Sequence, residues 1–555
     1  MAQITTPVRP HPRQIRAERL QPEISQEPGP SRAGLARRLI GSRLVVCVAL
    51  ILVLAPIYIF YSQLLGLGSN SDAAINVLEG WDMSHGRPLL DGWIQGNNSW
   101  MTNELLLYAV VAAIVGATPW VIVISHGIIY SIIIVLTGML ALGPTKNWRR
   151  SILVCGMVGA MLLPVTYETT AWMMLSVIDH LGTSIPLMIM LMIIDRRRLS
   201  WKLGFVTFGA LTWAMTSDHL ALYVGVLPVV IVCGLRAYFR AENRRTHVAI
   251  AIGALAAIPA DWLFKTTVEL LGGATRNNPP DAIFADVGHM PANVWETVHA
   301  IMIIFGSALF GQSTQNSKTE LLHLAVLATV VAGWILAFRA IKTLGLVDQT
   351  IITAITVNIL AFAFSPMPGP YYTAHEILIV VPFSVALAAR LIVPRLTTLR
   401  TQAPVYAGFA LAVAVLGYTL TKPAVPDPTI ELTRALQQQN LTYGLSGFWQ
   451  AASVTVQSGK TVEIVSVLND RHGNITPFWQ VMRDDWYDPA QHDARFVISD
   501  RNAMANTNED LNEQLLQKVF GAPQRAFHIK QFEIRVYDYN ILTRLPREKL
   551  PHQLP

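Results

Sequence analysis

Apolar residues form long, nearly uninterrupted runs over most of the chain between residues 41 and 421. A helix that crosses a bilayer needs about 20 such residues, so runs of this length are typical of transmembrane helices. Eleven crossings are predicted, near 43–64, 119–142, 151–167, 180–195, 203–217, 219–237, 246–264, 320–340, 350–366, 374–393 and 404–421. The pattern therefore predicts an all-α polytopic membrane domain over residues 41–421.

Two further apolar stretches, 104–118 and 297–312, are ambiguous, and the positions of Lys and Arg decide how they are assigned. Basic clusters favour the cytoplasmic side of a membrane. With the basic N-terminal tail inside and TKNWRR (145–150) also inside, only one crossing fits between residues 65 and 145. The stretch 104–118 is therefore expected on the outer face. Because FRAIK (338–342) is also expected in the cytoplasm, the same reasoning excludes 297–312 as a membrane crossing. An alternative with about thirteen crossings keeps both chain ends on the same sides.

This topology places the N-terminus in the cytoplasm and three sizeable pieces outside it: the loops 65–118 and 265–319, and the tail 422–555. Residues 1–40 are rich in Arg, Pro and Gln and are predicted to be a disordered cytoplasmic tail. In the C-terminal tail, alternating residues predict strands over 460–470 and 494–500, and NEDLNEQLLQKVFG (508–521) predicts a helix that ends at glycine. We expect a small extracytoplasmic α/β domain.

Composition supports a membrane protein and excludes several other classes. The chain is 52% hydrophobic and only 14% charged, whereas soluble domains carry about 25% charged residues. Its net charge of +6 gathers in short clusters beside apolar runs, so nucleic acid is not an expected partner. The three cysteines lie within apolar runs and form no disulfide framework or metal motif. Neither a Walker A motif nor HExxH occurs, so nucleotide-driven pumping has no support.

The segment SNSDAAINVLEGWDMSHGRPLLDGW (69–93) carries a dense group of acidic residues just beyond the first crossing. Residues 72–83 can form a short helix, with Ser71 as N-cap and Gly86 closing it. Its apolar side chains are expected against the bilayer: Ala74, Val77, Leu78 and Trp81. Such a helix would hold Asp72 at the membrane boundary, where partial desolvation raises a carboxyl pKa. Glu79 and Asp91 are expected to be solvated.

A carboxylate at that level suits one chemistry in particular, transfer of a sugar from a lipid-linked phosphate donor. The reaction needs a base that takes the proton of the acceptor hydroxyl. It also needs cations for the departing lipid phosphate. Asp72, Asp82 and Glu104 are the candidate catalytic residues. Four basic residues predicted on the outer side could bind the phosphate: Arg87, Lys265, Arg276 and Lys318.

Two Asp–His pairs, Asp179-His180 and Asp218-His219, lie at the predicted outer ends of crossings. Ionisable residues at membrane depth are costly and therefore point to function. Asp218 and His219 are candidate substrate-binding residues. With Asp72 they are also candidate ligands for a divalent cation, Mg²⁺ or Mn²⁺.

Several motifs of the first outer loop resemble the GT-C superfamily of membrane glycosyltransferases, and most closely multi-span actinobacterial proteins of that type. They are Asp72, Trp81-Asp82-Met83, Gly86, Gly92-Trp93 and Thr102-Asn103-Glu104-Leu105, with further likeness in SDHLALYVGVLP (217–228) and AHEILIVVPFSVALAAR (374–390). The resemblance implies a GT-C-like fold, a polyprenyl-phosphate sugar donor, a cell-envelope glycan acceptor and an outer-loop aspartate as general base. Asp72 takes that role by position.

The chain departs from the family pattern at one place, where His375-Glu376 replaces the usual Arg-Glu. An arginine there could grip the donor phosphate, and a titratable histidine would change the pH range of that contact. Tyr372 could stack on a sugar. Two alternatives to a glycosyltransferase stay open: a transporter or flippase of a lipid-linked intermediate, and a non-catalytic envelope-assembly protein with the same fold.

Overall fold

The structure is a computed structural model of the 555-residue chain. It describes residues 32–66, 71–96, 98–145, 147–164, 173–175, 180–239, 242–276, 284–307, 317–369, 371–396, 402–470, 472–478, 481–503 and 511–546. The chain divides into two compact units, residues 1–49 and 50–555.

Within the described ranges, six helical segments are long and apolar enough to cross a membrane. They are Arg43–Leu64 of α1 (Arg32–Leu64), α4 (Trp120–Leu142), Leu222–Phe239, which joins η2 (Leu222–Val226) to α9 (Leu227–Phe239), α10 (Arg244–Leu270), Leu321–Arg339 of α12 (Ser317–Arg339) and α13 (Leu346–Phe364). Each coincides with a predicted crossing. The mostly helical membrane character is thus confirmed.

The other five predicted crossings coincide with shorter helices of 13 to 17 residues: α5 (Trp148–Leu162), α7 (Ser184–Arg196), α8 (Leu203–Met215), α14 (Val380–Leu396) and α15 (Ala403–Thr419). A straight helix of 15 residues spans only about 22 Å, less than the hydrocarbon core of a bilayer. The predicted number of about eleven transmembrane helices is therefore not confirmed.

The two ambiguous stretches also form short helices, α3 (Glu104–Val115) and α11 (Met290–Ile304). One face of α3 packs inside the protein, where the Tyr108 hydroxyl lies 2.6 Å from Nε2 of His126 on α4. The opposite face exposes apolar side chains: Leu106, Val110 and Ile114. Both faces of α3 are therefore apolar, one packed in the protein and one exposed.

An ion-pair network fastens four helices of the membrane domain together. Arg390 of α14 donates to Asp195 of α7 at 2.9 Å, to Asp348 of α13, and to the carbonyl oxygen of Leu140 on α4 at 2.8 Å. The three charged side chains are 11–15% exposed, so their charges are poorly screened by water. The network holds helices that lie far apart in the sequence.

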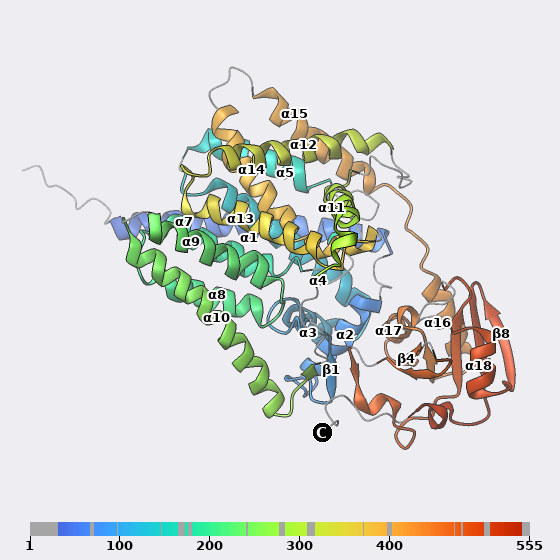
Figure 1. The fold of residues 1–555 in the computed structure, drawn as a ribbon. Helices are drawn as coiled ribbons and strands as arrows, with labels where there is room; N and C mark the ends of the chain where they lie inside the picture. The colour runs from blue at the N-terminus through green and yellow to red at the C-terminus, as the bar shows by residue number, and fades with distance from the viewer. Residues whose placement is uncertain are drawn as a thin grey trace, which may run out of the picture. The chain divides into compact units, whose positions relative to one another are not determined.

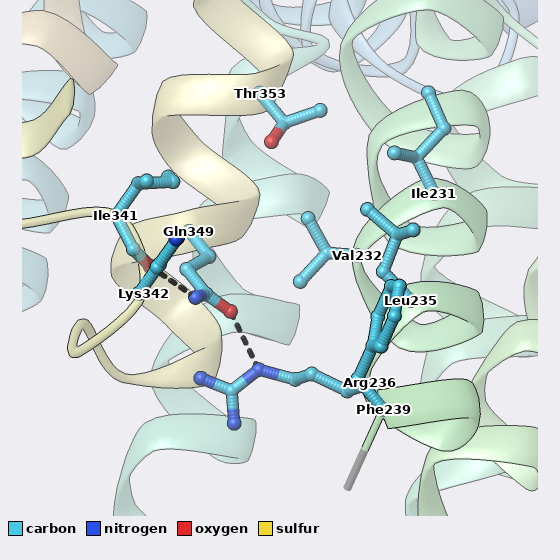
Figure 2. Close-up of a pocket in the computed structure, with 9 residues that line it drawn as sticks. All are labelled: Ile231, Val232, Leu235, Arg236, Phe239, Ile341, Lys342, Gln349 and Thr353. Atoms are coloured by element: carbon cyan, nitrogen blue, oxygen red, sulfur yellow. Dashed lines mark hydrogen bonds between the residues drawn. The ribbon is translucent and has the colours of Figure 1, made fainter.

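A cavity of about 630 Å³ lies between α9 and α13 (Figure 2). Its walls are mainly apolar, with two charged side chains, Arg236 and Lys342. Arg236 donates to the Gln349 side chain at 2.6 Å and to the carbonyl oxygen of Leu344 at 2.7 Å. The guanidinium therefore braces the loop before α13.

The C-terminal region contains a six-stranded sheet with strand order β5-β4-β3-β7-β9-β8 (Figure 1). The strands are β3 (Tyr443–Ser446), β4 (Glu463–Asn469), β5 (Ile475–Pro477), β7 (Phe496–Asp500), β8 (Arg525–Ile529) and β9 (Phe532–Val536). β3 pairs in parallel with β4 and β7, and the outer pairs are antiparallel. The two strands predicted from residue alternation are confirmed as β4 and β7.

Helices cover both faces of this sheet. α16 (Pro428–Gln438) and α17 (Phe448–Gln457) share one apolar core with Phe496 and Ile498, whereas α18 (Glu513–Phe520) packs with Val497, which points the other way. This follows from the alternation of side chains along β7. α18 ends before Gly521, whose φ is +76°. The predicted α/β region with its glycine-terminated helix is therefore confirmed.

The acidic segment of the first predicted loop forms α2 (Ser71–Ser84), as expected, and Gly86 follows with φ +102°. The prediction that its apolar face meets the bilayer is wrong for Ala74, Val77 and Leu78. These side chains are at most 4% exposed and pack with residues of α3 and of α17. The α2 helix is therefore an internal element between α3 and the C-terminal region.

A small sheet with strand order β2-β1-β6 joins the three pieces predicted to lie outside. β1 (Trp93–Gln95) comes from the first loop, β2 (Thr275–Arg276) from the second and β6 (Met482–Arg483) from the tail. Three predicted outer pieces thus share one backbone hydrogen-bonded structure. The remaining short helices are η3 (Val287–His289), η4 (Tyr371–Ile377), η5 (Asp484–Tyr487) and η6 (Ile541–Arg544).

The expectation that Glu79 is solvated is wrong, whereas Asp91 is exposed as expected. Glu79 is 1% exposed, and its Oε1 accepts a hydrogen bond from Gln95 Nε2 at 3.3 Å. Burial raises the pKa of Glu79 to about 8, against the lowering effect of the Gln95 hydrogen bond. The folded protein therefore holds a proton on Glu79 at neutral pH.

Replacing Glu79 with glutamine is expected to stabilise the protein in a pH-dependent way. The folded state keeps this proton up to about pH 8 and the unfolded state releases it near 4.5, so stability falls as pH rises through that window. Each pH unit in the window costs about 1.4 kcal/mol. Thermal unfolding at pH 5 to 9 should show E79Q gaining over the wild type as pH rises. A constant difference at all pH values would contradict the raised pKa.

Candidate functional site

Five ionisable side chains gather where apolar helices begin or end. Glu104 is the first residue of α3, His180 precedes α7, and Asp218 lies between α8 and η2. His375 and Glu376 belong to η4, just before α14. Segments up to about 270 residues apart in the sequence thus meet in one place, which we call the His180 cluster.

Asp218 is the most deeply buried member, with no exposed surface. Its Oδ2 accepts hydrogen bonds from Nδ1 of His180 at 2.9 Å and from the Thr183 hydroxyl at 2.7 Å, and its Oδ1 accepts the Leu220 amide at 2.8 Å. Burial would raise the pKa of Asp218, but the charge of His180 and these hydrogen bonds outweigh it and lower the pKa. Asp218 is therefore ionised and fixes the His180 ring.

Glu376 lies between the two imidazoles of the cluster. Its Oε2 is 3.6 Å from Nε2 of His180, and its Oε1 is 3.4 Å from Nε2 of His375. The two rings are nearly parallel, with centroids 6.1 Å apart. One potential ligand atom from each of these three residues lies within 4.8 Å of the others. The grouping could hold a metal ion.

Glu104 is buried against the loop that carries His180. It is 3% exposed, and neither carboxylate oxygen has a hydrogen-bond partner among the described residues. A Cβ added to Gly182 would lie 2.0 Å from its Oε1, so glycine is needed at that position. Burial raises the pKa of Glu104 to about 7, and the nearby Asp218 charge acts in the same direction. This carboxyl can accept or release a proton near neutral pH.

The backbone around the cluster is strained. His180 and Trp100 both have positive φ, +59° and +53°, a conformation that costs residues other than glycine about 1–3 kcal/mol. Their rings lie 5.2 Å apart. The backbone amide of Trp100 donates to the carbonyl oxygen of Ser217 at 3.1 Å, and the π-helical turn η2 follows Asp218 closely. Such strain and π-turns concentrate at functional sites.

The predicted catalytic residues on α2 lie in other surroundings. Asp72 is half-buried in the first turn of α2, and its neighbour Ser71 donates to the carbonyl oxygen of Trp449 on α17 at 2.8 Å. Asp82 accepts from the Trp93 indole at 3.0 Å and pairs with Arg483 at 3.1 Å. Asp82 thus links α2 to the C-terminal region.

The remaining candidates are more scattered. Arg87 is 36% exposed, 3.9 Å from Asp91. His219 is exposed, and its Nε2 is 3.5 Å from Nζ of Lys265, which pairs with Asp261. Tyr372 lies in η4, but its side chain, like those of Asp179 and Lys318, is outside the described residues. Of the predicted site residues, the structure brings together Glu104, Asp218, His375 and Glu376.

From the sequence, His180 was noted only as part of an Asp–His pair. Thr183, Gly182 and Trp100 were not identified as site residues. The useful signal was the position of His180 at the end of an apolar run. Among the described residues, the group with metal-ligand spacing is His180, His375 and Glu376, which differs from the predicted set of Asp72, Asp218 and His219. Asp218 contributes as the partner of His180.

Comparison with known proteins gives few matches. No family model matches the chain. No curated protein matches it. Among solved structures, the arabinofuranosyltransferase AftD from Mycobacteria is similar at 12% identity with a TM-score of 0.40, over 88% of this chain and 40% of that chain. The chain thus spans about 40% of the length of the AftD chain. Arguments about function therefore rest on the residues of this chain.

Proposed function

We propose that this chain is an integral membrane glycosyltransferase. It transfers a sugar from a polyprenyl-phosphate donor to a cell-envelope glycan or lipid on the outer face of the cytoplasmic membrane. The observation that carries the proposal is the His180 cluster, in which buried acids and imidazoles lie at the ends of apolar helices. A lipid carrier presents its phosphate and sugar at that level of a bilayer, beside the hydrocarbon core.

The chemistry of transfer needs a base with a pKa near the working pH. The pKa of Glu104, raised by burial to about 7, meets this requirement. Asp72 is the second candidate base, because it sits half-buried at the start of α2. In this proposal one of the two takes the proton of the acceptor hydroxyl as the bond to the lipid phosphate breaks.

The leaving phosphate needs positive charge or hydrogen-bond donors. His375 has a side chain that is 30% exposed, so it can reach a ligand from outside the cluster. His219 and Arg87 are further donors at the surface.

In this proposal the acceptor glycan binds to the C-terminal α/β region together with α2. That region contacts α2 through Ser71 and Trp449 and through Asp82 and Arg483. A glycan chain bound there could reach the helix ends without crossing the bilayer. The bilayer itself and the two substrates are the proposed partners, and nucleic acid is not.

Changing Asp72 to asparagine tests the role of α2 in transfer. The wild-type protein in nanodiscs should move label from prenyl-phosphate sugars to an envelope glycan, and D72N should lose most of that activity while it still inserts and folds. D91N, an exposed carboxylate of the same loop, is the matched control and should keep wild-type activity. Full activity of D72N would remove Asp72 from the mechanism.

The same assay separates the alternatives. A flippase would move a labelled lipid across the nanodisc or vesicle bilayer without making a new glycosidic bond. An assembly protein without activity would bind glycan or lipid and produce neither result.

A further inference from the structure

We propose that His180, His375 and Glu376 bind a divalent transition metal of the zinc type, and that Asp218 orients His180 as a ligand. The proposal rests on ligand geometry and not on any donor or acceptor, although it uses His375 and Glu376 of the cluster on which the proposed sugar transfer rests. It also differs in residues and in preferred metal from the Mg²⁺ or Mn²⁺ site predicted from the sequence.

Asp218 determines which nitrogen of His180 can act as a ligand. Oδ2 of Asp218 lies 2.9 Å from Nδ1 of His180, the distance of a hydrogen bond. With the hydrogen on Nδ1, Nε2 of the neutral ring is the nitrogen that can bind a metal. Carboxylate–histidine–metal triads use this arrangement to fix the tautomer and the ring orientation. Thr183 holds the carboxylate from a second side.

The lone pair of His180 Nε2 points toward another acceptor. Oε2 of Glu376 lies 3.6 Å away, and Oε1 of the same carboxylate faces Nε2 of His375 at 3.4 Å. A metal ion placed among the three residues would be within reach of both imidazoles and the carboxylate.

The spacing is close to what a zinc ion requires. Bonds of about 2.0–2.2 Å place neighbouring ligand atoms of a tetrahedron about 3.4 Å apart. Oε2 of Glu376 lies 3.6 Å from Nε2 of His180, its Oε1 lies 3.4 Å from Nε2 of His375, and one ligand atom from each residue lies within 4.8 Å of the others. Metal binding would draw these three side chains closer together.

The ligand types select the metal. Two imidazoles and one carboxylate are the ligands of catalytic zinc sites, which keep a fourth position open for water or substrate. Magnesium prefers oxygen ligands and retains its waters. Since His375 and Glu376 are 30% and 22% exposed, the open position would face outward from the buried side of the cluster.

The test uses the full-length protein purified in detergent and stripped with a chelator. Wild-type protein should take up zinc stoichiometrically in elemental analysis, and Co²⁺ should give the intense visible absorption of a tetrahedral complex. H375A and E376Q should weaken Co²⁺ binding at least ten-fold, and D218N by about 10–100-fold through loss of the hydrogen bond that orients His180. None of these readouts needs sugar transfer.

H299A is the matched control, because His299 forms a similar pair with Glu296, 3.5 Å apart, on α11. It should keep wild-type metal binding. If wild-type protein takes up neither Zn²⁺ nor Co²⁺, the proposal is wrong. This outcome does not depend on whether the variants fold. Binding that H375A and E376Q leave unchanged would equally overturn it. Metal binding without transfer activity would refute the proposed function alone, and transfer without metal binding would refute this site alone.

Discussion

Glutamine in place of Glu104 is expected to reduce sugar transfer by about 10²–10⁴-fold, the usual contribution of a positioned general base. The carboxyl of Glu104 is buried, lacks hydrogen-bond partners among the described residues and has its pKa raised to about 7. Glutamine fills nearly the same space beside Gly182, so the substitution removes the proton acceptor without adding volume.

The pH profile of transfer by the wild-type protein gives the second half of this prediction. Only the ionised carboxylate can take a proton, so the rate should rise as pH increases through about 7, the pKa of Glu104. In E104Q this rising limb should be absent from the residual activity. Initial rates with labelled prenyl-phosphate sugar at pH 5.5 to 8.5 measure both effects.

E296Q is the control for Glu104, because Glu296 is a half-exposed glutamate on α11. It should leave the rate and the pH profile unchanged. If E104Q kept its activity and D72N lost it, the base would be Asp72 and Glu104 would have a structural role. Equal losses in E296Q and E104Q would show that the assay reports folding rather than chemistry.

Methionine in place of Arg390 is expected to destabilise the membrane domain by about 3–5 kcal/mol, the usual cost of leaving a buried charge without its partner. The guanidinium pairs with both Asp195 and Asp348 and also donates to a carbonyl oxygen of α4. Its loss leaves two carboxylates, each only 15% exposed, close together without a cation. Thermal unfolding in detergent should show a large fall in the midpoint.

Two further variants test whether the loss of stability in R390M comes from the ion-pair network. R196M removes an exposed arginine of α7 that donates to the Met139 carbonyl oxygen at 2.8 Å, and it should have little effect. Adding D195N and D348N to R390M should restore part of the stability, because the unpaired charges are then gone. Comparable losses in R196M and R390M would mean that the network does not act as a unit.

Local patterns were sufficient to predict the elements of the fold that depend on neighbouring residues. The run 43–64, the helix that became α2 and the strand now seen as β7 each follow from periodicity and terminal residues. The environment of α2 could not be predicted in this way. Its apolar face packs on α17, nearly 380 residues later, and a bilayer and a protein core favour the same side chains.

At the site, too, the sequence pattern identified single residues but not the contacts between residues that lie far apart in the chain. The adjacent pair Asp218-His219 was expected to work together, but Asp218 is fully buried while His219 is exposed. The imidazole that actually meets Asp218 is His180, 38 residues earlier. Position at the end of an apolar run identified both residues as candidates. Their contact depends on how α7 and α8 pack, which no pattern in the sequence reports.

The hydrogen bonds that β1 makes with β2 and β6 have a consequence for how the C-terminal region can be used. A shortened protein that ended near residue 421 would lose β6 and α17, and the apolar side of α2 would then face water. The tail is therefore not a detachable module that could be exchanged for another domain. Substitutions that change its surface would have to leave the strand pairing intact.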